Sequence, residues 1–98
     1  AGNEERYRHW LTEFSADTPG QVTQIRRNIA AGNPDDARQA AHAIKGRVGM
    51  LGMTGLYAIV AALEAALKQG EPTDELLDQL HAAVETLCAE IRSALDVA

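Results

Sequence analysis

The stretch LDQLHAAVETLCAEIRSAL, residues 77–95, carries apolar side chains at steps of three and four residues. The side chains in this series are Leu77, Leu80, Val84, Leu87, Ile91 and Leu95. Such steps place them along one side of a helix, as in the apolar seam of a bundle helix. The preceding residues 71–75 combine a proline with acidic residues, which is typical of a helix start. The sequence therefore predicts a long C-terminal helix that packs against other helices.

Upstream, we expect two helices separated by an interruption: a first helix over about residues 4–15 and a second helix that ends at Gly32. The order Asp17-Thr18-Pro19 favours Thr18 as the N-cap and Pro19 as the first helical residue of the second helix. One side of the first helix carries the apolar residues Tyr7, Trp10, Leu11 and Phe14. In the second helix we expect Val22, Ile25 and Ile29 to face inward.

Two further helices are expected over residues 34–51 and 54–70. The third helix starts at Asn33-Pro34-Asp35-Asp36. Here a capping residue and a proline precede two acidic residues, which stabilise the positive N-terminal end of a helix. Connections this short make neighbouring helices antiparallel. We therefore predict an all-α fold, an antiparallel up-down-up-down four-helix bundle of the second to fifth helices. The additional N-terminal helix is expected to cover one end.

The composition indicates one domain, residues 1–98, with 46% hydrophobic residues, and residues 1–3 are expected to be disordered or left from cloning. A net charge of −5 argues against nucleic-acid binding. No apolar run approaches the ~20 residues of a membrane span, and no signal-peptide pattern is present. The single cysteine, Cys88, fits a reducing compartment, so a cytoplasmic location is expected. Because no methionine starts the chain, we expect a fragment of a longer protein.

The stretch HAIKGRVGMLG, residues 42–52, places three glycines close to a histidine within a predicted helix. The apolar stripe of this helix consists of Ala37, Ala41, Ile44, Val48 and Leu51. His42 lies roughly 140° from Ala37 on a helical wheel. We therefore expect the imidazole on the outer face of the helix or at its edge.

Two of these glycines, Gly46 and Gly49, follow His42 by four and seven residues, and we interpret them as leaving the surface beside the imidazole bare. Lys45 and Arg38 lie three residues after and four before His42, and Arg47 lies further round. An exposed nucleophilic nitrogen with nearby cations suits phosphoryl transfer. An ordinary surface histidine, with glycines that allow close helix packing, is the alternative that the local pattern leaves open.

The series His42-Ala43-Ile44-Lys45-Gly46, then Leu51-Gly52 and Leu63-Glu64, resembles histidine-containing phosphotransfer (HPt) domains. The segment Ala30-Ala31-Gly32-Asn33 before the third helix also looks like this family, so the resemblance covers most of the chain. HPt domains are often modules of bacterial hybrid sensor histidine kinases. The resemblance implies a four-helix bundle with a phosphorylated histidine on an exposed helix face.

The resemblance further implies that His42 accepts a phosphoryl group from the aspartyl phosphate of a receiver domain and passes it to another receiver. Lys45 would be the nearby cation and Gly46 the residue that leaves access. Gly46, Gly49, Arg38 and Arg47 are expected on the receiver-docking surface. Arg47 departs from the small residue that is often seen after the glycine of this family.

No nucleotide-binding motif is present, so we expect a phosphocarrier without ATP-dependent kinase activity of its own. No bound cofactor or metal is expected, and Mg²⁺ should belong to the receiver. The expected partners are response-regulator receiver domains, with no nucleic acid and no direct membrane contact, and the isolated domain is expected to be a monomer.

Three alternatives remain open at this point. The phosphoacceptor helix pair of a histidine kinase normally has an acidic residue after the histidine, where this chain has Ala43. A non-catalytic adaptor bundle that binds a receiver-like partner would not need His42 with Lys45 and Gly46. A metal-binding bundle would need a histidine near Glu85 and Cys88. The remaining histidines, His9 and His81, lack flanking glycines. We expect His9 to be solvated on the first helix and His81 to flank the apolar seam of the last helix.

Overall fold

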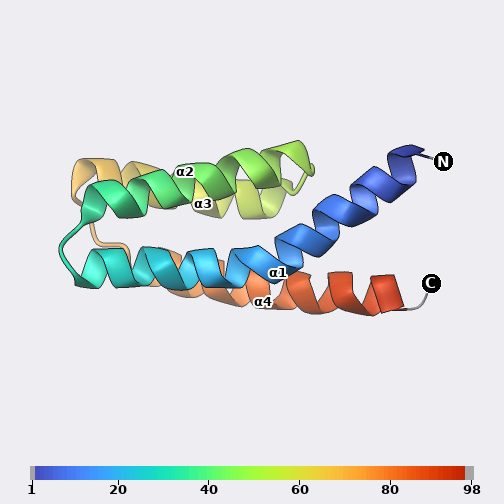
Figure 1. Cartoon of the computed structure of the whole chain (residues 1–98). Coiled ribbons are helices and arrows are strands. Elements are labelled where there is room, and N and C mark those ends of the chain that lie inside the picture. The colour runs from blue at the N-terminus through green and yellow to red at the C-terminus, as the bar shows by residue number, and fades with distance from the viewer. Residues whose placement is uncertain (1, 97–98) are drawn as a thin grey trace.

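Four helices follow one another along the chain: α1 (Gly2–Ala30), α2 (Pro34–Met50), α3 (Thr54–Gln69) and α4 (Asp74–Asp96). The structure is a computed structural model that describes residues 2–96, with side chains for residues 4–95, and no strand occurs among them (Figure 1). The all-α prediction is confirmed. Of the residues expected to be disordered or left from cloning, Ala1 lies outside the described residues, whereas α1 already begins at Gly2.

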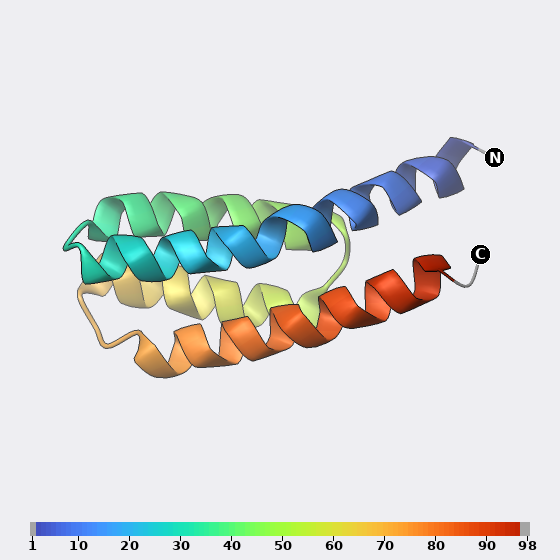
Figure 2. The same ribbon diagram turned by 60° about the horizontal axis from the view of Figure 1, so that its bottom comes forward.

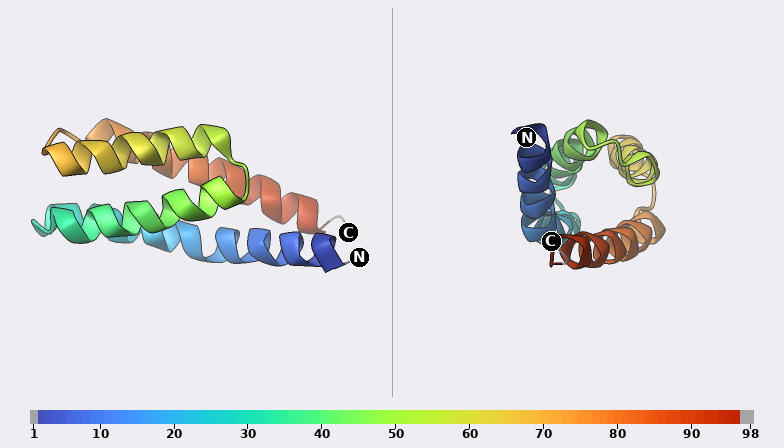
Figure 3. Two further views of the ribbon diagram at one scale, coloured as in Figure 1. Left: turned by 90° about the horizontal axis from the view of Figure 1, so that it is seen from above. Right: turned by 90° about the vertical axis from the view of Figure 1, so that its right-hand side faces the viewer.

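Each helix packs against the two helices beside it, and the four helices surround a single core. The backbones of α1 and α2, α2 and α3, α3 and α4, and α4 and α1 approach closely, whereas those of the diagonal pairs do not within residues 2–96. Successive helices run in opposite directions, and the end-on view shows them at the corners of a square (Figure 3). This is the up-down-up-down arrangement predicted from the short connections.

The break predicted at Pro19 is wrong, because α1 is one continuous helix of 29 residues with Pro19 in its interior. A proline there cannot donate to the carbonyl of residue i−4, which costs helix stability. Packing opposes this cost, because the buried side chains Phe14, Thr18, Val22 and Ile25 keep helical spacing across the proline. Thr18 is accordingly a buried interior residue and not an N-cap.

The N-terminal half of α1 therefore does not cover one end of the bundle as a separate helix. It lies at an angle to the C-terminal half of α1 and extends, together with the end of α4, beyond the turn between α2 and α3 (Figures 1 and 2). Trp10 and Leu11 are partly buried against the core, whereas Tyr7 is exposed. The extended helix ends thus lengthen the apolar core on the α1–α4 side.

The C-terminal seam confirms the pattern from which the fold was predicted. Leu77, Leu80, Val84 and Ile91 are buried, while Leu87 and Leu95 are partly buried against the same core. Cys88 also belongs to the core, and burial raises the pKa of its thiol. Cys88 therefore packs as a small apolar residue.

The helices end at glycines with left-handed backbone geometry. Gly70 has φ 72° and donates its N–H to the carbonyl of Ala66, which closes α3. Gly52 has φ 73° in the short turn that leads from α2 to α3. A residue with a side chain adopts this backbone conformation only with strain. Glycine adopts it freely, which allows both turns to be tight.

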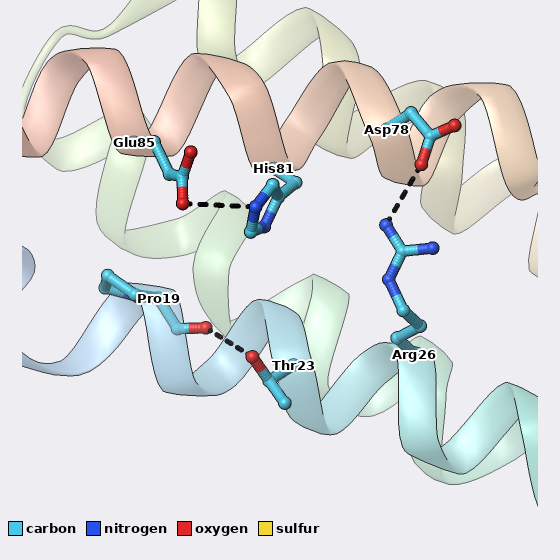
Figure 4. Close-up of polar contacts among 6 residues, drawn as sticks. All are labelled: Pro19, Thr23, Arg26, Asp78, His81 and Glu85. Atoms are coloured by element: carbon cyan, nitrogen blue, oxygen red, sulfur yellow. Dashed lines mark hydrogen bonds and ion pairs between the residues drawn. The ribbon is translucent and has the colours of Figure 1, made fainter.

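Polar contacts between α1 and α4 are few and lie on the surface. Arg26 on α1 donates to Asp78 on α4 at 3.2 Å (Figure 4). Exposed ion pairs of this kind contribute roughly 0–1 kcal/mol to stability. The apolar seam therefore carries most of the stabilisation. Within residues 2–96, no helix combines the length and the apolar character that crossing a lipid bilayer requires.

We predict that Thr18→Val stabilises the domain. The side chain of Thr18 is 0% exposed, and its hydroxyl oxygen has no hydrogen-bond partner among the described residues. Replacing this hydroxyl by a methyl group of similar size removes the cost of burying it, and the gain should be about 1 kcal/mol in urea unfolding. Thr23→Val is the matched control, because Thr23 is exposed and donates to the carbonyl of Pro19 (Figure 4). A loss of stability in Thr18→Val would contradict this account.

Candidate functional site

His42 lies on the exposed face of α2, as its position on the helical wheel predicted. Its side chain is 69% exposed. The opposite side of the same helix carries the buried residues Ala37, Ala41, Ile44 and Val48. The apolar stripe of α2 therefore fixes the rotation of the helix, and that rotation places the imidazole outside the core.

A carboxylate from the neighbouring helix contacts the imidazole. Oε1 of Glu64 on α3 lies 3.0 Å from Nδ1 of His42. Oε2 of the same carboxylate lies 2.6 Å from Nζ of Lys45. The side chain of Glu64 is only 20% exposed, so the carboxylate bridges the two α2 side chains at the edge of the α2–α3 interface.

The bridging contact favours the charged forms of both groups. The short charge-assisted contact with Glu64 raises the pKa of Lys45 above its ordinary value. The contact with Lys45 lowers the pKa of Glu64, and the contact with His42 lowers it further, whereas desolvation acts in the opposite direction. Glu64 is therefore a carboxylate at neutral pH and can only accept hydrogen bonds.

The position of Glu64 determines which imidazole nitrogen is available. Because a carboxylate accepts, Nδ1 of His42 must donate, and the neutral ring then carries its proton on Nδ1. The lone pair is left on Nε2. Within the described part of the chain, no hydrogen bond or ion pair involves Nε2 of His42. The exposed nitrogen is thus the nucleophilic one.

The other two histidines have the opposite arrangement. Nε2 of His81 lies 3.2 Å from Glu85, one turn further along α4 (Figure 4). Nε2 of His9 lies 3.2 Å from Glu13 on α1. In both residues the distal nitrogen faces a carboxylate of its own helix, whereas in His42 the proximal nitrogen does so. Both histidines are exposed, which was predicted for His9.

The two glycines that follow His42 have different roles. A Cβ atom built on Gly46 meets no atom within 4 Å, so the surface at Gly46, one turn after His42 on α2, is open. A Cβ atom on Gly49 would lie 3.3 Å from Cε2 of Tyr57. The prediction that Gly49 also clears the surface at His42 is therefore wrong, because the glycine makes room for a tyrosine ring from α3.

The three cations that lie near His42 in the sequence, Arg38, Lys45 and Arg47, do not gather in one place. This corrects the expectation that Arg47 joins the receiver-docking surface at His42. Arg47 pairs with Asp17 on α1 at 3.7 Å, because it lies five residues from His42 and hence roughly 140° round the helix. Lys45 is directed to Glu64. Of the three cations, only Arg38 lines an open pocket together with His42.

Sequence reasoning quoted Glu64 only as part of the resemblance and missed its contact with His42. The signal was present, because Glu64 is the one acidic residue in α3 and directly follows the buried Leu63. A residue directly after a buried one lies at the border of the apolar face of its helix, from where a long side chain can reach the neighbouring helix. Across residues 4–95, no three His, Cys, Asp or Glu side chains gather as ligands for a metal ion.

We predict that Glu64 controls the tautomer of His42. In the wild type, ¹⁵N spectra of the neutral imidazole should show the proton on Nδ1, whereas Glu64→Ala should shift the population toward the Nε2–H form. Glu64→Gln keeps an acceptor oxygen and should retain the Nδ1–H form. His81 serves as an internal reference, because its Nε2 faces Glu85. An unchanged tautomer in Glu64→Ala would contradict this assignment.

The comparisons with known proteins agree with the geometry of the site. Neither the curated proteins nor the solved structures yielded a match to the chain. Residues 9–93, which include all of α2 and α3 and most of α1 and α4, match the family model of the Hpt domain. This family performs histidine phosphotransfer in phosphorelays and interacts with receiver domains. The chain therefore belongs to the Hpt domain family.

Proposed function

We propose that His42 is the phosphorylated residue of this Hpt domain, accepting a phosphoryl group from the aspartyl phosphate of one receiver domain and passing it to the aspartate of another. The observation that carries this proposal is the imidazole itself. The side chain is 69% exposed, and its Nδ1 contacts Glu64. Its Nε2 makes no hydrogen bond with the described residues of the domain.

The transfer is an in-line displacement at phosphorus. The lone pair of Nε2 forms the N–P bond while the bond between phosphorus and the aspartyl oxygen breaks, and the aspartate leaves as a carboxylate. The ring keeps its proton on Nδ1, which donates a hydrogen bond to the carboxylate of Glu64. The resulting positive charge on the ring is offset by the carboxylate. Because a cationic ring leaves readily, the reverse displacement by a second aspartate is also supported.

The surface beside His42 suits brief contact with another protein. Gly46 leaves open surface one turn after His42, and further along the same two helices Met50 on α2 and Tyr57 on α3 are exposed apolar side chains, 65% and 42% accessible. A small patch of this composition fits a weak, transient interface. The acidic site of a receiver, with its Mg²⁺, would supply the counter-charge for the transferred group, so this domain needs neither ATP nor a metal of its own.

The same reasoning supports a place for the domain beside other signalling modules. We propose that it serves as a cytoplasmic module of a phosphorelay, within or next to a bacterial hybrid sensor kinase, since an Hpt domain without a nucleotide site must receive its phosphoryl group from elsewhere. An adaptor that binds receivers without chemistry is the competing function, and the next experiment separates the two.

Incubating the domain with a ³²P-labelled receiver and Mg²⁺ should transfer label to the wild type. His42→Gln should abolish labelling, because glutamine has no nucleophilic nitrogen, while its circular dichroism spectrum stays that of a helical bundle. His81→Gln is the matched control and should label normally. If the wild type binds the receiver but takes up no label, the domain is an adaptor.

We predict that Gly46→Leu slows the transfer by at least tenfold, because a bulky side chain would occupy the open surface beside the imidazole. The same change should favour the helix by roughly 0.5–1 kcal/mol, since leucine has a higher helix propensity than glycine. Gly20→Leu is the control, because Gly20 also lies in a helix with nothing within 4 Å of a built Cβ atom. A normal transfer rate in Gly46→Leu would show that Gly46 does not provide the access.

A further inference from the structure

A pocket of about 350 Å³ opens beside His42, and it is lined by Arg38, Gln39, His42 and Glu64. Arg38 and Gln39 lie four and three residues before His42 on α2, hence one turn nearer the N-terminus of the helix. Side chains on a helix lean toward its N-terminus, so the imidazole extends over the turn that carries these two residues. The pocket thus lies where the imidazole points.

Lys45 is poorly placed for a group on Nε2. Its ammonium lies 2.6 Å from Glu64, and Glu64 contacts Nδ1. The two nitrogens of an imidazole ring point away from each other, so a phosphoryl group on Nε2 is directed away from the Lys45–Glu64 pair. Moving Lys45 to the phosphoryl group would break this pair and leave the Glu64 carboxylate uncompensated near a dianion.

Arg38 is not held by a comparably short ion pair. Its guanidinium lies 3.9 Å from the carboxylate of Asp35, which is at the limit for an ion pair, and both side chains are substantially exposed. An arginine can donate two parallel hydrogen bonds to phosphoryl oxygens. The side-chain amide of Gln39 offers further donors at the same pocket. The pocket therefore presents a cation and neutral donors next to the reactive nitrogen.

We propose that Arg38 and Gln39 bind the phosphoryl group carried on Nε2 of His42, while Lys45 acts as a positioning residue that holds Glu64 against Nδ1. This inference rests on the proposed function and assigns separate tasks to the two cations beside the histidine. Arg38 binds the phosphoryl group after its transfer to Nε2. Lys45 orients the imidazole through Glu64, from the opposite edge of the ring.

The phosphoryl group itself provides the test. The domain can be phosphorylated with phosphoramidate, whose N–P bond breaks as the bond to Nε2 forms and ammonia leaves, or with a phosphorylated receiver. The pH titration of the ³¹P shift then gives the apparent pKa of the phosphoryl group. A neighbouring cation favours the dianion, so Arg38→Gln should raise this pKa by roughly half a unit or more. Lys45→Gln should raise it clearly less.

Arg26→Gln is the matched control, because it removes the same charge from the α1–α4 surface and should leave the titration unchanged. On phosphorylation, the side-chain amide signals of Gln39 should shift in ¹H–¹⁵N spectra. A wild-type titration in Arg38→Gln, a larger effect in Lys45→Gln, or unmoved Gln39 signals would overturn the pocket assignment. The absence of any N-bound ³¹P signal in the wild type with both donors would instead overturn the proposed function.

Discussion

The carboxylate of Glu64 joins α3 to two side chains of α2, and the chemistry of the site depends on this bridge. One oxygen faces Nδ1 of His42 and the other faces Lys45. The bridge forms only while α2 and α3 pack in one register, which the buried stripes of both helices enforce. The apolar core thus determines which nitrogen remains nucleophilic in an imidazole that itself lies on the exposed face of α2.

The sequence was sufficient to predict α2, α3 and α4, the antiparallel order of the bundle and the exposed position of His42. These features follow from apolar spacing, because a stripe that must be buried fixes both the type of element and its rotation. The prediction failed at Pro19, where local proline chemistry indicated a helix start. There the apolar face from Phe14 to Ile25 continues in register, and its burial outweighs the missing hydrogen bond.

The details of the site were less accessible to sequence reasoning, because they depend on contacts between helices. Helical spacing places Gly46 and Gly49 on the same side of α2, yet only the packing of α3 shows that Tyr57 lies against Gly49. Similarly, charge alone suggested that Lys45, Arg38 and Arg47 act together. The neighbouring helices supply Glu64 and Asp17, which draw two of these three side chains away in different directions.

The burial of Cys88 has a practical consequence for following partner exchange. The residue is 1% exposed, and burial raises the pKa of its thiol, which stays protonated at neutral pH, so alkylating reagents react with it slowly while the bundle is folded. A cysteine introduced on the outer surface of α2 would therefore be the preferred target of a maleimide dye. One fluorophore could then report association with a receiver in a chain that retains every native core residue.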